Sequence, residues 1–304
     1  MKVLLPYKTR PEGLFAAREV LGARGDDCTL LRCQTAEKLR EACRSVSPDL
    51  LLTSECAVLR RCDGVPAAFL ASDFCCPDKL TDCALCAVLI PHDDLSFDFI
   101  NQGARDRSVL SCGVPLPQAL RDSLPRTQSL AQLGLRQDKP VFLLLADGVH
   151  LNEIKSTVRA THDLFPEVQT LLLCADSARR SAFMSAFAAF ERVYVLSQSE
   201  NLALALSAAD AVFTAAFAQP VCAAARQGKI VILLRTPLSR VRINAQYLDS
   251  RSVAFCGRTA ADNVSYAGRL LSGVRLRRIM QNAQEKYILP DAEERLTRFA
   301  EGRM

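Results

Sequence analysis

The sequence predicts an α/β protein built from two doubly wound domains, each with a parallel sheet covered by helices. Short runs rich in Val, Leu and Ile alternate along the chain with amphipathic segments of helical length. Near-continuous apolar strands of this kind are typical of parallel sheets that are buried on both faces. A polar, proline-containing stretch interrupts the alternation before the middle of the 304 residues, which favours two domains over one.

The first domain is predicted from the start of the chain. Its expected strands are residues 2–6, 28–33, 49–53, 66–72, 84–90 and 108–112, and its expected helices are 11–24, 35–46 and 94–103. In the first helix, Leu14, Ala17 and Val20 share one face at the period of an α-helix. Pro11 suits the first helical turn, and Gly25 suits the end of the helix.

The alternation restarts more strongly near residue 140. The expected strands are 140–146, 168–174, 193–196, 211–215, 230–234 and 252–256, and the expected helices are 151–164, 177–190, 201–209, 220–227, 241–251 and 262–271. We therefore expect domains at 1–115 and 139–274, a linker at 116–138, and a C-terminal helical segment at 275–304. Ligands of such folds bind beyond the carboxyl ends of the strands, so we expect the site in the cleft where the two sheets face each other.

Composition and charge exclude several classes of protein. Apolar residues make up 49% and charged residues 23%, which is globular composition and excludes a disordered chain. No apolar run is long enough for a membrane-spanning helix, and the first apolar run is too short for a signal peptide, so we expect a soluble, cytoplasmic protein. The net charge of +5 suits an anionic ligand or membrane surface and is too small to indicate nucleic-acid binding.

The 13 cysteines are an odd number, which without a secretory signal indicates reduced thiols rather than a disulfide scaffold. The densest cluster comprises Cys75, Cys76, Cys83 and Cys86. Its spacing leaves two interpretations open, a thiolate zinc site or thiols that serve as small core hydrophobes. We favour buried thiols and expect no bound metal.

Three segments together resemble one enzyme family. They are Ser-Asp-Phe at 72–74 followed by Gly-Val-Pro at 113–115, the run 140–148, and the run 208–248. In this order and spacing they resemble the GT-B glycosyltransferases of the family-28 type, which include monogalactosyldiacylglycerol synthases, processive diacylglycerol glucosyltransferases and the N-acetylglucosaminyltransferase of peptidoglycan precursors. The resemblance implies two facing Rossmann-like domains, a UDP-sugar donor, a lipid-linked or small-molecule hydroxyl acceptor, peripheral contact with the inner face of the membrane, and no cofactor.

The resemblance also implies site residues. The glycine-rich loop that meets the donor's diphosphate at a helix N-terminus corresponds to residues 146–150, where one glycine remains. The implied nucleotide-sugar-binding residues are Gly148, His150, Gln198, Ser199, Arg240 and Asn244. Asp73 and Glu12 are the carboxylates available as a general base. Lys8 and Arg10 form either an anion site or a solvated rim.

The chain departs from this family at donor-binding positions. It has Phe217-Ala218 for a Gly-Gly turn, Ala223 for the ribose-binding glutamate, Arg240-Val241 for a sugar-binding pair, and Glu12-Gly13 for a Gly-His. A methyl group accepts no hydroxyl hydrogen bond, so losing the glutamate alone weakens donor binding by about a hundredfold. Two hypotheses follow: an inverting hexosyltransferase, or a catalytically silent GT-B scaffold that binds an anionic metabolite, a lipid or a partner protein.

Two further features of the sequence can each be interpreted in two ways. Asp210 and Asn244 suit either ligand contacts or turns and caps. The basic amphipathic run at 269–279 predicts either contact with an anionic membrane or an ordinary surface helix.

Overall fold

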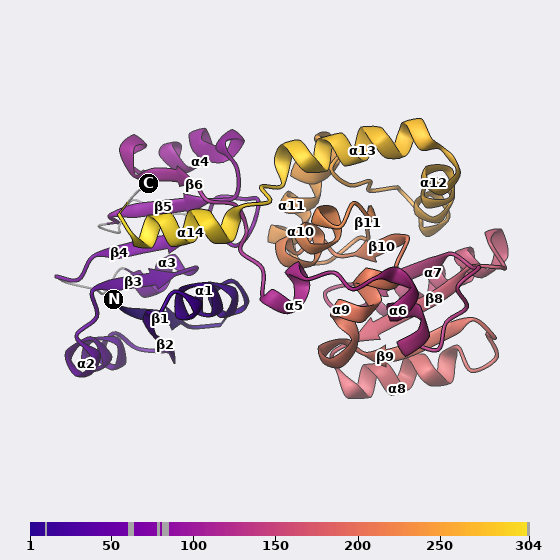
Figure 1. Cartoon of the computed structure of the whole chain (residues 1–304), viewed down its shortest axis with the longest axis horizontal. Helices are drawn as coiled ribbons and strands as arrows, with labels where there is room; N and C mark the ends of the chain where they lie inside the picture. Colours follow the sequence, from indigo (N-terminus) through magenta and orange to yellow (C-terminus); the bar gives the residue numbers. More distant parts are fainter. Residues whose placement is uncertain (10, 60–63, 78–79, 81–84, 303–304) are drawn as a thin grey trace. The chain divides into compact units, whose positions relative to one another are not determined.

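The computed structural model describes residues 1–9, 11–59, 64–77, 80 and 85–302. They form two compact units, Met1–Gln118 with Ile288–Met304, and Ala119–Tyr287, which we call unit 1 and unit 2 (Figure 1). Each unit holds one parallel sheet, of six strands in unit 1 and five in unit 2. The predicted α/β fold with two parallel sheets is confirmed.

The sheet of unit 1 has the strand order β2-β1-β3-β4-β5-β6. Its strands are β1 (Lys2–Tyr7), β2 (Asp27–Arg32), β3 (Leu50–Thr53), β4 (Ala67–Leu70), β5 (Ala87–Ile90) and β6 (Val109–Ser111). Their bounds lie close to the predicted ranges, although residue 84 of one range lies outside the described residues. The order changes direction at β1, so the loops that follow β1 and β3 meet at the carboxyl edge of the sheet.

Helices cover both faces of this sheet. They are α1 (Glu12–Ala23), α2 (Ala36–Val46), α3 (Cys56–Leu59), α4 (Ser96–Asn101) and α14 (Ala292–Ala300). On one face, Leu14 of α1 and Leu296 of α14 join Leu5 of β1 in one buried cluster. On the other face, Phe69 of β4 contacts Phe99 of α4, with ring centroids 6.5 Å apart.

Unit 2 has the strand order β11-β10-β7-β8-β9. Its strands are β7 (Val141–Leu145), β8 (Gln169–Cys174), β9 (Val193–Ser197), β10 (Ala211–Thr214) and β11 (Ile230–Leu233). Its helices are α6 (Arg126–Gln132), α7 (Leu151–Leu164), α8 (Ser177–Ala186), α9 (Gln198–Ala208), α10 (Ala218–Arg226), α11 (Ser239–Ser250), α12 (Ala260–Ser272) and α13 (Val274–Tyr287), and α5 (Gln118–Arg121) spans the boundary between the units. The strand order changes direction between β7 and β10, which makes the ends of these strands the switch point of the sheet.

The predicted strand at 252–256 is wrong, because only Phe255 pairs with β11, as an isolated bridge to Ile232. The N–H groups of Val253 and Ala254 donate instead to the carbonyl of Leu248 in α11. The end of α11 therefore takes the hydrogen bonds that a strand would need.

Asp210 holds the amino edge of the second sheet. Its Oδ2 accepts hydrogen bonds from Val141 N at 2.8 Å and from Arg126 Nη2 at 2.9 Å. Lys229 Nζ donates nearby to the carbonyls of Ser207 and Ala209, and burial lowers the pKa of this lysine. Because ligands of doubly wound sheets bind at the opposite, carboxyl edge, Asp210 has an architectural role.

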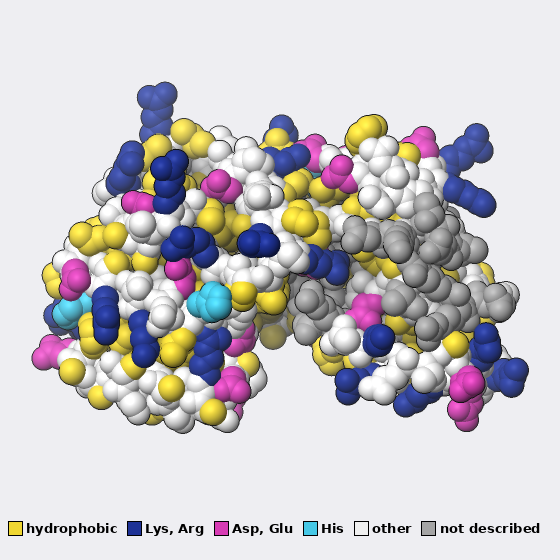
Figure 2. All heavy atoms as spheres, turned by 180° about the vertical axis from the view of Figure 1, so that it is seen from behind, with side chains coloured by type: hydrophobic (Ala, Val, Ile, Leu, Met, Phe, Trp, Pro, Cys, Tyr) yellow, Lys and Arg dark blue, Asp and Glu magenta, His cyan; other side chains and the backbone are white. Residues whose placement is uncertain are grey.

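The basic run at 269–279 is divided between two helices. α12 ends at Ser272 and α13 begins at Val274. Leu270 is 1% exposed whereas Ile279 is 51% exposed, so the apolar residues of the run do not share one surface stripe. Figure 2 shows Lys and Arg side chains interspersed with hydrophobic and uncharged ones over the visible face. Among the described residues, every helix is too short or too polar for a transmembrane segment.

Candidate functional site

The loop after β7 lies at the switch point of unit 2 and turns on Gly148. This residue has φ +72°, in the left-handed region that favours glycine. A Cβ at this position would lie 2.5 Å from Cε2 of Phe217, which follows β10. Glycine is therefore required both by the backbone and by the aromatic ring packed on it.

Contacts from three elements fix this loop. Thr236 Oγ1, after β11, donates to the carbonyl of Gly148 at 2.6 Å, and the Arg179 guanidinium of α8 donates to the carbonyl of Val149. The carboxylate of Asp147 accepts from Ala175 N at 3.4 Å, at the end of β8. The carbonyls of Gly148 and Val149 and the carboxylate of Asp147 thus have partners within the protein.

Most backbone N–H groups of the same segment, in contrast, have no acceptor among the described residues. α7 begins directly after the loop, with His150 as its N-cap residue and no hydrogen bond from the cap side chain. The backbone N–H groups of Gly148, His150, Leu151, Asn152 and Glu153 donate to no described residue, whereas that of Val149 donates to the carbonyl of Ala146 at 3.2 Å. Such a run at the positive end of a helix dipole is suited to binding phosphate oxygens.

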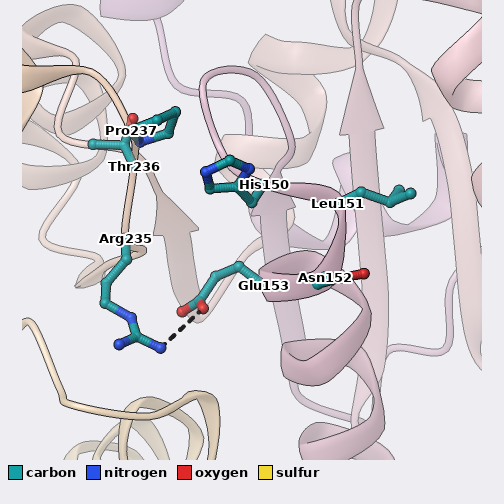
Figure 3. Close-up of a pocket in the computed structure, with 7 residues that line it drawn as sticks. All are labelled: His150, Leu151, Asn152, Glu153, Arg235, Thr236 and Pro237. Atoms are coloured by element: carbon teal, nitrogen blue, oxygen red, sulfur yellow. Dashed lines mark hydrogen bonds and ion pairs between the residues drawn. The ribbon is translucent and has the colours of Figure 1, made fainter.

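A cavity of about 570 Å³ opens at the start of α7 (Figure 3). Its lining residues are His150, Leu151, Asn152 and Glu153 from the start of α7, and Arg235, Thr236 and Pro237 from the loop after β11. Arg235 Nη2 lies 3.4 Å from Glu153 Oε2, and the arginine side chain is 60% exposed. The cavity therefore combines an accessible guanidinium, an imidazole and the helix N–H groups.

The structure brings only some of the predicted nucleotide-sugar residues together. Gly148 and His150 lie on the cavity loop. Gln198 and Ser199 begin α9 after the edge strand β9, two strand spacings or about 10 Å from β7. Arg240 lies in the first turn of α11, a few residues after the cavity loop that carries Arg235. A single extended ligand would have to span the ends of three strands to reach both Gly148 and Gln198.

Asn244 is fully buried in α11. Its Nδ2 donates to the carbonyl of Ala216 at 2.9 Å. Since Ala216 precedes Phe217, this hydrogen bond fixes the loop that places the ring on Gly148. The structure thus gives Asn244 a supporting contact within the protein.

In unit 1, the carboxylate of Glu55 binds the loop that follows β1. Glu55 accepts hydrogen bonds from Lys8 N at 2.7 Å, from Thr9 N at 2.9 Å and from Thr9 Oγ1 at 2.7 Å. The loop amides that a doubly wound domain offers to an anion are thus bound to Glu55. The side chain of Lys8 is exposed, and Arg10 lies outside the described residues.

Glu55→Gln is expected to destabilise unit 1 by about 1–2 kcal/mol, because the charge-assisted hydrogen bonds to the loop weaken. Urea unfolding of the variant measures this loss. Glu41→Gln, at an exposed position of α2, is the matched control. Equal unfolding midpoints of the two variants would show that the Glu55 contacts do not stabilise the loop.

The two predicted base residues both belong to unit 1. Asp73 follows β4 and is 8% exposed. Glu12 begins α1, and its side chain lies outside the described part of the chain.

The described cysteines are mostly buried or half-buried thiols. Burial raises the pKa of Cys28 to about 11 and that of Cys112 to about 12, so these thiols stay protonated near neutral pH. Within the described ranges, no group of three or more His, Cys, Asp or Glu side chains is arranged to hold a metal ion. Cys83 of the predicted cluster lies outside these ranges.

Arg235 and Thr236 line the cavity but were not predicted as site residues from the sequence. The signal that could have found them is the Arg-Thr-Pro segment directly after a fully apolar strand, because polar residues at the carboxyl end of a parallel strand point to a ligand site. The packing of Phe217 on Gly148 has no local signal.

No protein-family model matches the sequence, and no curated protein matches it. Solved structures match it over nearly its whole length. MnaA of S. aureus, solved with UDP, is 13% identical with a TM-score of 0.72, covering 100% of this chain and 97% of that one. UDP-GlcNAc 2-epimerase of Neisseria meningitidis, bound to UDP-GlcNAc, is 13% identical with a TM-score of 0.68 over 99% of this chain and 100% of that one.

A third solved structure matches the chain to a similar extent. MurG of Acinetobacter baumannii is 12% identical with a TM-score of 0.67, over 99% of each chain. Because an epimerase and MurG match about equally well at such low identity, the matches resolve the fold and not the family. The chain has the GT-B fold.

Proposed function

We propose that the protein binds a UDP-sugar through unit 2 and transfers its hexose to a hydroxyl group of a lipid-linked or small-molecule acceptor. The donor's diphosphate would lie at the start of α7. The observation behind this proposal is the set of backbone N–H groups of Gly148 and of residues 150–153, which donate to no described residue at the switch point. The cavity there adds the guanidinium of Arg235 and the imidazole of His150.

The reaction would be an inverting displacement. The acceptor oxygen forms a bond to the anomeric carbon while the bond from that carbon to the diphosphate oxygen breaks. The helix N–H groups and Arg235 stabilise the negative charge that develops on the departing diphosphate. The acceptor proton passes to a carboxylate base, for which Asp73 and Glu12 are the proposed residues.

Thermal unfolding with UDP, UDP-glucose and UDP-GlcNAc tests the binding step. A nucleotide at one hundred times its Kd stabilises the folded state by about 2.7 kcal/mol, which raises the unfolding temperature by several degrees. Arg235→Ala is expected to weaken UDP binding about tenfold, because a charge-assisted contact is lost. Arg278→Ala, at an exposed position of α13, is the matched control. An unfolding temperature that no uridine nucleotide changes would contradict the proposal.

A second candidate is a catalytically silent GT-B scaffold that binds an anionic ligand. The observation that favours it is the apolar character of the β10 loop and α10, where the Phe217 ring packs on Gly148 and Ala223 is fully buried. Measuring UDP release from UDP-hexoses with hydroxyl acceptors separates the candidates. Binding without release supports the scaffold, and release supports the transferase.

A further inference from the structure

The cavity at the start of α7 shares part of its wall with a second cavity of about 560 Å³, which lies between α7 and the start of α12. Glu153 and Arg235 line both cavities. Their ion pair, the dashed line in Figure 3, is therefore part of the wall of both cavities.

Only one of the two oxygens of the Glu153 carboxylate has a partner within the described residues. The side chain is 12% exposed, and its Oε2 lies 3.4 Å from Arg235 Nη2. Its Oε1 is buried and accepts no hydrogen bond from any described residue. Charge-assisted N–H···O contacts are usually about 2.7–2.9 Å long, so the pair with Arg235 is loose. A buried carboxylate oxygen without a donor is costly, which makes this group ready to accept a hydrogen bond from a ligand.

A sugar hydroxyl is the donor that fits this position. A phosphate would be repelled by the carboxylate, and a cationic ligand group would compete with Arg235 for it. Rotation about the last torsion of Glu153 exchanges its two oxygens, and the mostly exposed Arg235 side chain can move with little loss of packing. The cavity thus offers anion-binding N–H groups beside a hydroxyl acceptor, which matches a molecule with a phosphate next to a polyol.

We propose that Glu153 accepts hydrogen bonds from hydroxyl groups of the donor's hexose. It would give the site a carboxylate for the hexose hydroxyls, a contact separate from the ribose-binding position 223, which is alanine. The inference rests on the proposed function, because a diphosphate at the start of α7 places the attached hexose beside Glu153.

Glu153→Gln keeps the size of the side chain and removes its charge. Isothermal titration of UDP, UDP-glucose and UDP-GlcNAc into this variant tests the inference. In the wild type we expect at least one UDP-hexose to bind more tightly than UDP, and in the variant we expect this preference to fall tenfold or more. Glu285→Gln, at an exposed position of α13, should keep the wild-type preference. Glu153→Asp keeps the charge but withdraws the carboxylate by one methylene group, so this variant should also lose the preference for a UDP-hexose over UDP. It replaces Glu153→Gln in the test if the glutamine variant does not fold.

The outcomes separate the two proposals. If the wild type binds no uridine nucleotide, the proposed function fails, and this inference fails with it. If the wild type binds UDP and both UDP-hexoses equally, or if the Glu153 variants keep the preference, the assignment of Glu153 fails while nucleotide binding stands.

Discussion

Gly148→Val is expected to destabilise unit 2 by about 3 kcal/mol, because two penalties combine. The residue has φ +72°, which a β-branched side chain rarely adopts, and its Cβ would lie 2.5 Å from Cε2 of the Phe217 ring. Urea unfolding followed by circular dichroism measures the loss. Nucleotide binding by the same variant has to be measured well below its unfolding midpoint, so that lost binding is not confused with lost folding.

Gly134→Val is the matched control. Gly134 has φ +68°, but a Cβ there would meet nothing within 4 Å. We expect a loss of only about 1–2 kcal/mol from the backbone conformation. Equal losses in the two variants would mean that the Phe217 ring yields without cost, and the ring would then be no barrier to a ligand at Gly148.

Asn244→Asp is expected to cost about 3 kcal/mol, because it places a carboxylate at a fully buried position and removes the amide that donates to the carbonyl of Ala216. Asn244 is fully buried, and its Nδ2 donates to the carbonyl of Ala216 at 2.9 Å. A carboxylate cannot donate to that oxygen. Its pKa in the folded state would rise above the unfolded value, so the stability lost at pH 7 should return as the pH falls towards about 4 and the acid becomes protonated.

The measurement for Asn244→Asp is the urea midpoint at both pH values. Asn282→Asp, at an exposed position of α13, controls for the added charge. A loss that is small, or that does not shrink at acidic pH, would contradict the role of Asn244 as the donor that fixes the β10 loop.

The sheets were predictable because burial on both faces leaves a strong local pattern. All residues of β7 and β11 are apolar and buried, so a continuous hydrophobic run marks each strand without reference to its neighbours. Residues 252–256 are also largely apolar, but the N–H groups of Val253 and Ala254 are taken by α11. That competition between two elements is invisible in a local pattern.

The candidate site was less predictable because its defining contacts join distant segments. Gly148 and His150 could be found from their position directly after a buried strand. The ring of Phe217 on Gly148, the hydroxyl of Thr236 on the Gly148 carbonyl and the carboxylate of Glu55 on the β1 loop each depend on the strand order. Sequence reasoning placed the strands in the chain but did not derive which strands are neighbours.

The position of α14 bears on how the chain is made. Leu296 packs in the same apolar cluster as Val3, Leu14 and Leu52, although all of unit 2 lies between them in the sequence. A ribosome therefore delivers unit 2 in full before unit 1 can close its interior. Until Leu296 emerges, the nascent first unit presents an uncovered apolar surface to solvent, which is the kind of surface that chaperones bind.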